Sequence, residues 1–320
     1  MADKSDIGTG TAFPDAGRED IGENMVQVLM STYNGEKYIK EQLDSILGQT
    51  YQDIRILVRD DSSVDGTAAI LKEYSDRYHN IEFYIGDNLG AQGSFFDLFA
   101  HADWQAEYIA TSDQDDVWYA DKIETAVGCL QGLDMPGLYC CKTQLTDQYL
   151  NPLENRMRKN VPDITFGNAL IENICTGCTM VINQALYRLV QGKWPRQSVI
   201  HDWWFYQVAL CFGKVIYDDT PHIFYRQHED NVIGLDSKRL ELIKRQLKSF
   251  LKFRGKYTAQ MEEFIHTFPL NGEHKYLAEL MAGTKHSWRC RGKILFEARI
   301  RRQGKFDTFL FKIMLAIGWL

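Results

Sequence analysis

Residues 25–34, MVQVLMSTYN, form a near-continuous apolar run that ends in polar side chains. A strand of a parallel sheet has this composition when helices cover both of its faces. Two later stretches repeat the pattern, IRILVRDDSS (54–63) and EYIATSDQDD (107–116). Between these runs, residues 35–50, 63–78 and 93–102 have the apolar spacing of helices, and residues 81–88 have the composition of a further strand. The sequence therefore predicts a β-α-β-α-β-α-β unit, with a mostly parallel, Rossmann-like central sheet flanked by helices.

The rest of the chain continues the α/β pattern and then becomes helical. We expect a strand at 138–147, followed by a turn, a strand and the start of a helix at 173–186. A helix is expected at 198–213 and a last strand at 213–228. Beyond Leu235 almost every segment has helical spacing. We therefore expect three parts: a flexible leader (1–24), an α/β domain (25–235) and a helical, basic C-terminal region (236–320).

Charge is divided unevenly along the chain, whose net charge is −7. Residues 235–320 contain 18 Lys and Arg against 8 Asp and Glu, so residues 1–234 carry a net charge of −17. An acidic body repels phosphate backbones, which argues against nucleic acid as a partner. The seven cysteines lack a framework spacing, and the N-terminus shows no secretory signal, so we expect reduced thiols and a cytoplasmic location.

Three carboxylates directly follow the apolar run YIATS: Asp113, Asp115 and Asp116. Like charges this close repel one another, so a positive group is expected between them. Mg²⁺ or Mn²⁺ suits this position, because both ions prefer carboxylate and phosphate oxygens. The structural alternative is a solvated acidic turn, or a cap for the helix expected near residues 119–127.

Polar clusters end three of the predicted strands, in STYN, RDDSS and SDQDD. In open α/β sheets, ligands bind beyond the carboxyl ends of the strands, so Thr32, Asp61 and Asp115 are expected to line one crevice. Asp61 is suited to accept a hydrogen bond from the imide N–H of a base. Ser62 or Ser63 is expected to cap the next helix, and capping and turn formation alone is the alternative for the whole motif.

The segments VLMSTYNGEKYIKEQLDSILGQTY, RDDSSVDGT and SDQDDVWYADKIE resemble, in this order, successive motifs of family-2 inverting glycosyltransferases with the GT-A fold. With HDWW and YRQHEDNVIG, they are similar to bacterial rhamnosyltransferases of O-antigen, capsule and cell-wall polysaccharide synthesis. The resemblance covers residues 25–235 and implies a GT-A catalytic domain with a helical C-terminal extension. It also implies a nucleotide-sugar donor and a glycan acceptor, and attachment to a membrane would suit an acceptor that grows on a lipid.

The resemblance assigns roles to individual residues. Asp113 and Asp115 match the DxD motif, with Asp115 as the direct metal ligand. His228 falls where some members supply a further contact to the metal or the diphosphate, although a lone histidine is as often structural. The nucleotide and donor contacts would come from Thr32, Tyr33, Asn34, Asp61, Asp113 and Asp116.

Asp202, in IHDWWF, falls where the family keeps its catalytic base. A carboxylate beside an apolar wall has a raised pKa and accepts the proton of an acceptor hydroxyl, and Trp203 and Trp204 are candidates for that wall. The structural alternative is an N-cap or first-turn carboxylate that the helix dipole favours.

The cysteines offer a different interpretation. Cys175 and Cys178, with Cys140 and Cys141, have the ligand types of a four-thiolate zinc site. Adjacent residues of a strand point to opposite faces, however, so Cys140 and Cys141 are not expected to reach one ion. We expect the cysteines to be small apolar fillers and Gly177 to belong to a loop on the acceptor side.

The chain from Lys285 onward has nine basic residues against Glu297 and Asp307, and it closes with FDTFLFKIMLAIGWL. This apolar segment, interrupted by Lys312, is too short to span a bilayer. Two interpretations are open. The segment binds a membrane surface of anionic lipid, or it packs on the protein body or on another subunit.

The sequence thus predicts a metal-dependent inverting hexosyltransferase that moves L-rhamnose from dTDP-L-rhamnose to a hydroxyl of a cell-surface polysaccharide precursor. It would work in the cytoplasm, on the inner face of the cytoplasmic membrane if the tail binds lipid. A UDP-hexose or UDP-N-acetylhexosamine donor is the first alternative. More distant alternatives are a nucleotidyltransferase, for which STYNGEKY is a poor phosphate loop, and a non-catalytic nucleotide-sugar binding protein.

Overall fold

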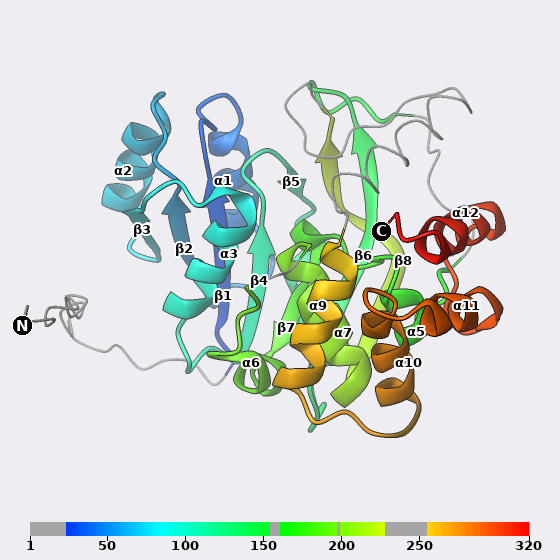
Figure 1. Cartoon of the computed structure of the whole chain (residues 1–320). Helices are drawn as coiled ribbons and strands as arrows, with labels where there is room; N and C mark the ends of the chain where they lie inside the picture. The colour runs from blue at the N-terminus through cyan, green and yellow to red at the C-terminus, as the bar shows by residue number, and fades with distance from the viewer. Residues whose placement is uncertain (1–23, 154–160, 197–198, 228–254, 320) are drawn as a thin grey trace, which may run out of the picture.

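The computed structural model describes residues 24–153, 161–196, 199–227 and 255–319. Within these residues lies one mixed sheet of eight strands in the order β3-β2-β1-β4-β7-β6-β8-β5 (Figure 1). The strands are β1 (Val26–Thr32), β2 (Ile54–Asp60), β3 (Ile81–Ile85), β4 (Tyr108–Ser112), β5 (Val117–Trp118), β6 (Gly137–Thr146), β7 (Val181–Asn183) and β8 (Lys214–Arg226). The helices are α1 (Ile39–Leu47), α2 (Thr67–Arg77), α3 (Gly90–His101), α4 (Lys122–Leu130), α5 (Phe166–Ala169), α6 (Gln184–Val190), α7 (His201–Phe212), α9 (Lys256–Thr267), α10 (Gly272–Gly283), α11 (Trp288–Phe296) and α12 (Lys305–Ala316), with a 3₁₀ turn, η1 (Gly177–Thr179).

The N-terminal half of the sheet is parallel, as predicted. β1 pairs in parallel with β2 and with β4, and β2 pairs in parallel with β3. Val26, Val28 and Met30 face one hydrophobic core, while Leu29 faces the other. Burial on both faces explains why β1 is a continuous apolar run rather than an alternating one. Connected by α1, α2 and α3, these strands confirm the β-α-β-α-β-α-β unit.

The other half of the sheet is mixed. β7 pairs antiparallel with β4 and with β6, β8 runs parallel to β6, and the short β5 pairs antiparallel with β8. Parallel pairings are thus the majority among the described strands. Because β7 is antiparallel to β4, the turn η1, which directly precedes β7, lies at the edge where β4 ends.

Two cores lie on opposite faces of the sheet. One contains the apolar face of α1, with Ile39, Leu43 and Ile46, together with residues of α2 and α4. The other contains residues of α3, α5, α6 and α7, and it continues into the C-terminal helices. The Tyr257 ring of α9 lies 5.5 Å from the Trp203 ring of α7 and 5.5 Å from the Phe311 ring of α12.

The C-terminal region is helical, as predicted, and packs onto the α/β body through α9 to α12. The expected boundary at residue 235 and the leader up to residue 23 lie outside the described residues. Among the helices that are described, none is both long and apolar enough to cross a bilayer.

Candidate active site

The loops after β1 and β4 are joined at the edge where the parallel strands end. The backbone N–H of Tyr33 donates to Gln114 Oε1 (2.8 Å), and Gln114 Nε2 donates back to the Tyr33 carbonyl (3.0 Å). A Cβ at Gly35 would lie 2.2 Å from Gln114 Oε1, so this bridge requires glycine at position 35. The half-exposed Tyr33 ring is thereby held beside the carboxylate loop, and sequence reasoning overlooked Gln114.

The loops after β1 and β2 are joined by side chains that were predicted to contact a nucleotide. Asn34, in the left-handed region at φ 49°, donates its N–H to Ser63 Oγ (2.8 Å) and accepts the Val64 N–H at Oδ1 (2.9 Å). The buried Thr32 hydroxyl donates to Asp60 Oδ1 (2.9 Å). Thr32 and Asn34 therefore shape this edge of the sheet, and direct contact with a ligand stays a prediction for both.

Asp61 is buried at the same edge, but its carboxylate already has protein donors. It accepts the backbone N–H groups of Leu89 and Gly90, both at 2.8 Å, and it pairs with the guanidinium of Arg59. Arg59 also donates to Asp97 on α3 (2.9 Å). Asp61 thus anchors the start of α3 to β2, and its bond to a base stays a prediction.

The expectation that Ser62 or Ser63 caps α2 is wrong. Ser62 Oγ donates to the Gly86 carbonyl (2.7 Å), and Ser63 Oγ donates to Asp60 Oδ1 (2.5 Å). The N-cap of α2 is Gly66, which has no side-chain cap. The two serines close the loop onto neighbouring strand ends because the helix starts later than its sequence spacing suggests.

Asp116 neither caps a helix nor lies in a solvated turn, so both structural alternatives for it are wrong. It is buried, and its Oδ1 accepts the backbone N–H of Arg226 (3.1 Å). Its Oδ2 has no hydrogen-bond partner among the described residues. The N-cap of α4 is Asp121, which makes no side-chain capping bond. Asp116 therefore carries an unsatisfied buried oxygen, which requires an explanation.

Arg226, at the end of β8, fixes the backbone of the carboxylate loop. Its Nε donates to the Asp115 carbonyl (2.8 Å), Nη1 donates to the Gln148 carbonyl (2.6 Å), and Nη2 pairs with Glu41. The guanidinium also lies over the Tyr38 ring, 4.5 Å from its centroid. Sequence reasoning missed this residue, although a cation that ends a strand within an acidic body was a usable signal.

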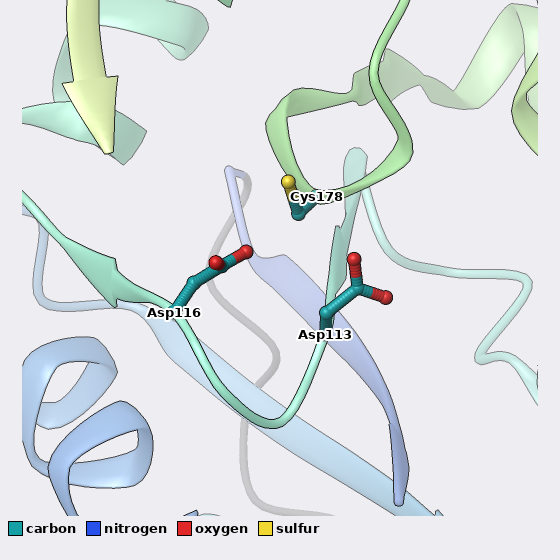
Figure 2. Close-up of side chains that lie close together, drawn as sticks. All are labelled: Asp113, Asp116 and Cys178. Carbon is teal, nitrogen blue, oxygen red and sulfur yellow. The ribbon is translucent and has the colours of Figure 1, made fainter. Parts of the chain in front are cut away.

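The carboxylate loop concentrates negative charge around a thiol. Burial and the charge of Asp115 raise the pKa of Asp113; burial and the charges of Asp115 and Asp113 raise the pKa of Asp116 still further. Ligand atoms of Asp113, Asp116 and Cys178 all lie within 4.8 Å of one another. Figure 2 shows both carboxyl groups pointing toward the turn that carries Cys178. Asp115, the expected ligand, is not part of this group.

This arrangement fits a divalent cation. Burial, and after it the repulsion between neighbouring carboxylates, raises the pKa values of Asp113 and Asp116, and a bound cation would favour the charged forms of both. Among the described residues, Asp116 Oδ2 has no hydrogen-bond partner and is open to such an ion. Carboxylate oxygens suit Mg²⁺ and Mn²⁺ alike, and burial raises the pKa of the Cys178 thiol, which keeps it protonated and makes it a poor ligand for either ion. Of the metal ligands that the sequence predicts, Asp113 lies in this group together with Asp116, and the ligand role of Asp115 stays a prediction.

The four-thiolate alternative is not supported in the described residues. Cys140 faces one core and Cys141 the other, as strand geometry requires, and Cys175 and Cys178 are divided in the same way. Cys178 belongs to a core, as a filler would, and its sulfur also lies within 4.8 Å of a ligand oxygen of Asp113 and of Asp116.

Asp202 lies in the first turn of α7, and it is buried. Burial raises its pKa to about 7, and the charge of Asp113 adds to this effect, while backbone hydrogen bonds from Trp203 and Gly177 oppose it. A helix N-terminus favours a carboxylate by at most about 2 kcal/mol. A shift from 3.8 to about 7 corresponds to about 4 kcal/mol, so burial dominates. Oδ1 of Asp202 has no partner among the described residues.

Gly177 and His201 enclose Asp202. A Cβ at Gly177 would lie 3.2 Å from Asp202 Oδ2 and 3.1 Å from His201 Nε2, closer than a side chain comfortably permits. His201 is stacked on Phe95 with ring centroids 3.9 Å apart, and burial lowers its pKa to about 3, so the ring is neutral. Asp202 is therefore buried and closely surrounded, and the neutral ring of His201 supplies no positive charge to it.

The two tryptophans after Asp202 face away toward the C-terminal helices. The ring of Trp203 lies 5.5 Å from Tyr257, and that of Trp204 lies 5.2 Å from Phe264, both partners being on α9. They support α7 from the core, and the predicted wall beside Asp202 is supplied by Gly177, His201 and their neighbours. His228 lies outside the described residues.

Comparison with known sequences gives consistent matches. Residues 27–190 match the family model described as glycosyl transferase family 2. A dTDP-rhamnosyl transferase of Shigella flexneri, RfbG, is 34% identical over 232 residues, which cover 67% of this chain and 79% of the relative. An uncharacterized glycosyltransferase of Rickettsia typhi, RT0329, is 27% identical over 296 residues, covering 90% and 89%.

Solved structures share the fold. TarS residues 1–349 of S. aureus in complex with UDP superimpose with a TM-score of 0.57 and 17% identity, over 86% of this chain and 73% of that one. The mannosyltransferase PcManGT of Pyrobaculum calidifontis, in complex with GDP-Man and Mn²⁺, gives a TM-score of 0.53 and 16% identity, over 95% and 85%. At these identities the likeness concerns the fold alone.

Proposed function

The chain belongs to glycosyltransferase family 2, and from this premise we propose that it is a metal-dependent, inverting enzyme that transfers L-rhamnose from dTDP-L-rhamnose to a polysaccharide precursor. The donor is proposed from the similarity to a protein named a dTDP-rhamnosyl transferase. A UDP-hexose or UDP-N-acetylhexosamine is the alternative donor within the same reaction class. Membership of this family argues against the two more distant alternatives, a nucleotidyltransferase and a non-catalytic nucleotide-sugar binding protein.

The buried carboxylate of Asp202 carries this proposal. Its pKa of about 7 lets it be ionised at neutral pH and still accept a proton, and Oδ1 has no partner among the described residues. As the acceptor hydroxyl oxygen forms a bond to the anomeric carbon, its proton passes to Asp202. The bond from that carbon to the diphosphate oxygen breaks on the opposite face, and the nucleoside diphosphate leaves. One such in-line displacement inverts the anomeric configuration.

The carboxylates after β4 are proposed to hold Mg²⁺ or Mn²⁺ through Asp113, Asp115 and Asp116. When bound, the ion would neutralise charge that develops on the departing diphosphate. Arg226 serves as a positioning residue, because it fixes the Asp115 carbonyl and the Asp116 carboxylate from β8. His228 stays a predicted further ligand.

The nucleotide is proposed to bind along the ends of β1 and β2. Tyr33 offers a half-exposed ring there, and Gln114 holds its backbone beside the carboxylate loop. Thr32 and Asn34 shape this crevice, and Asp61 fixes the start of α3 at its border. We propose that the base packs against the Tyr33 ring.

The acceptor is proposed to be a growing, lipid-linked glycan on the inner face of the cytoplasmic membrane. This location follows from the acceptor chemistry of the rhamnosyltransferases that the chain resembles. It requires the enzyme to work at a lipid surface although no described helix crosses a bilayer.

Turnover of nucleotide sugars by the purified chain tests the proposal. We expect release of dTDP from dTDP-L-rhamnose with Mn²⁺, little release from UDP-N-acetylglucosamine, and loss of activity in Asp202→Asn. Asp219→Asn is the matched control, because Asp219 pairs with Lys142 on the surface. Unchanged transfer by Asp202→Asn would defeat the base role. Thermal stabilisation by ATP but by no nucleotide sugar would contradict the function as a whole.

A further inference from the structure

We propose that α11 and α12 form a docking surface for a bilayer that contains anionic lipid. This α11–α12 face consists of Trp288, Leu295, Phe296, Phe306, Phe309, Ile313, Ile317 and Trp319, with the cations Arg289, Lys293 and Lys305. The two helices contact each other and lie at the end of the molecule opposite α2 and β3 (Figure 1). The inference deepens the proposed location, but it rests on surface chemistry and not on the identity of the donor.

The outward face of α12 is apolar. Its side chains recur at intervals of three and four residues, which places them on one face of a helix. Their exposed fractions are 58% for Phe306, 62% for Phe309, 37% for Ile313 and 59% for Ile317. The inward face buries Phe311, Met314 and Leu315 in the core. α12 is therefore apolar on both faces, whereas a helix on the surface of a soluble protein turns polar residues outward.

α11 continues this surface. Trp288 is 77% exposed, Leu295 38% and Phe296 87%, and their spacing of seven and eight residues places them on one face. Arg289 and Lys293, one turn apart, flank that face, and the Arg289 guanidinium lies 5.7 Å from the centre of the Trp288 ring. Aromatic residues beside cations are typical of helices that lie in a membrane interface.

The apolar side chains are concentrated and not scattered. Of the 18 large hydrophobic side chains that are exposed in the described residues, eight lie between residues 288 and 319, a tenth of the chain. Isolated exposed apolar residues need no explanation, but eight of them on and directly after two helices that contact each other mark a candidate interaction surface. The structure thus combines the two open interpretations of the tail: α12 packs on the body and also presents an apolar face.

Internal ion pairs sharpen the charge argument. Arg299 pairs with Glu297, Arg301 with Asp163, and Lys285 with Glu262, and Lys312 is buried against backbone carbonyls. The charges of these four residues are therefore compensated by groups of the protein itself. Arg289, Lys293 and Lys305 are exposed and have no acidic partner within the described residues, so their charge is available to an anion.

Charge complementarity favours lipid over a second copy of the chain. Two copies paired through this face about a two-fold axis would bring the same three cations together, which is unfavourable. Anionic headgroups instead meet the cations, while the aromatic and aliphatic side chains enter the boundary below them. The proposed occupant is therefore a bilayer surface with anionic lipid.

Vesicle binding by the full chain, without donor, tests the proposal. We expect co-sedimentation with phosphatidylglycerol-containing vesicles and weaker binding to pure phosphatidylcholine. Replacing Phe306 and Phe309 together by Ser should lower the partition coefficient by about tenfold or more. Each of Arg289→Gln and Lys293→Gln should lower it about fivefold on anionic vesicles only. Trp104→Ser, at a ring 54% exposed outside this face, should have no effect.

Two outcomes would contradict the proposal that the α11–α12 face binds a bilayer. One is equal vesicle binding by the wild type and the Phe306→Ser/Phe309→Ser variant. The other is a stable dimer in sedimentation velocity that this variant dissociates, which would assign the face to a second copy. Both measurements are independent of catalysis. Release of dTDP in solution should be the same for wild type and variant, so failure of the docking surface can be told apart from failure of the proposed function.

Discussion

Asp202→Asn should stabilise the folded protein at alkaline pH while it abolishes transfer. The carboxylate is buried, and its pKa is raised from 3.8 to about 7 chiefly because burial disfavours its charge. Ionising it in the folded chain therefore costs free energy that the unfolded chain does not spend. Asparagine has nearly the same shape and no charge, so the variant avoids this cost but cannot accept a proton.

The size and sign of the effect follow from linkage. Below pH 3.8 the carboxyl is protonated in both states, and the substitution changes little. As pH rises, the unfolded chain ionises first, so the wild type loses stability relative to the variant until the folded pKa of about 7 is passed. The full difference is about 4 kcal/mol, of which roughly 2 to 3 kcal/mol develops between about pH 5 and about pH 8. Poor hydrogen bonding of the new amide would subtract about 1 to 2 kcal/mol at every pH.

Urea unfolding of wild type and Asp202→Asn at the two pH values measures this directly. The variant should gain stability relative to the wild type as pH rises, and its turnover should fall about 10²–10⁴-fold, the usual contribution of a general base. Asp219→Asn serves as the control, because Asp219 is half exposed in its pair with Lys142 and should change stability by less than about 1 kcal/mol at either pH. A stability difference that does not vary with pH would refute the argument from burial.

Three further predictions concern the carboxylate loop after β4 and the glycine beside Asp202. Chelation of divalent ions should abolish turnover, and added Mn²⁺ should restore it. Asp115→Asn should weaken Mn²⁺ binding about tenfold or more in an electron paramagnetic resonance titration. If the variant binds Mn²⁺ as tightly as the wild type, Asp115 is not a ligand. Arg226→Lys loses a planar, multidentate donor, so it should lower the free energy of unfolding in urea by about 1 to 3 kcal/mol and weaken Mn²⁺ binding. Glu41→Gln breaks only the half-exposed ion pair, so its effects on stability and on Mn²⁺ binding should both be smaller. Gly177→Ala should lower kcat with little change in the KM for donor, because its Cβ would lie 3.2 Å from Asp202 Oδ2; an unchanged kcat would show that this pocket tolerates displacement.

The parallel half of the fold was predictable because its cause is local. A strand covered on both faces needs a nearly unbroken run of apolar residues, and β1 shows one in its own sequence from Val26 to Met30, interrupted only by the buried Gln27. The pairing of β7 was not predictable in the same way. It spans three residues, Val181–Asn183, and its antiparallel partners β4 and β6 are selected by contacts far along the chain.

The site was predictable in its positions and not in its contacts. Strand-end polar clusters located Asp113, Asp116 and the loops near them. What holds these residues comes from long-range pairs: the Arg226 N–H reaches Asp116 across 110 positions, and Gln114 reaches Tyr33 across 81. Helix-start spacing also suggested a helix cap as the alternative role of Asp116, and this alternative is wrong because α4 begins after Asp121.

The two acidic strand ends, RDDSS and SDQDD, look alike in sequence and have opposite electrostatic outcomes. At the end of β2, Asp61 meets the buried guanidinium of Arg59 and two backbone N–H groups, so its charge is compensated inside the protein. At the end of β4, Asp116 receives a neutral backbone N–H, and both it and Asp113 have raised pKa values. A cation bound there would offset both the burial and the mutual repulsion of these carboxylates. The buried Asp116 oxygen, unpartnered among the described residues, therefore supports our proposal that the β4 end, and not the β2 end, holds the metal.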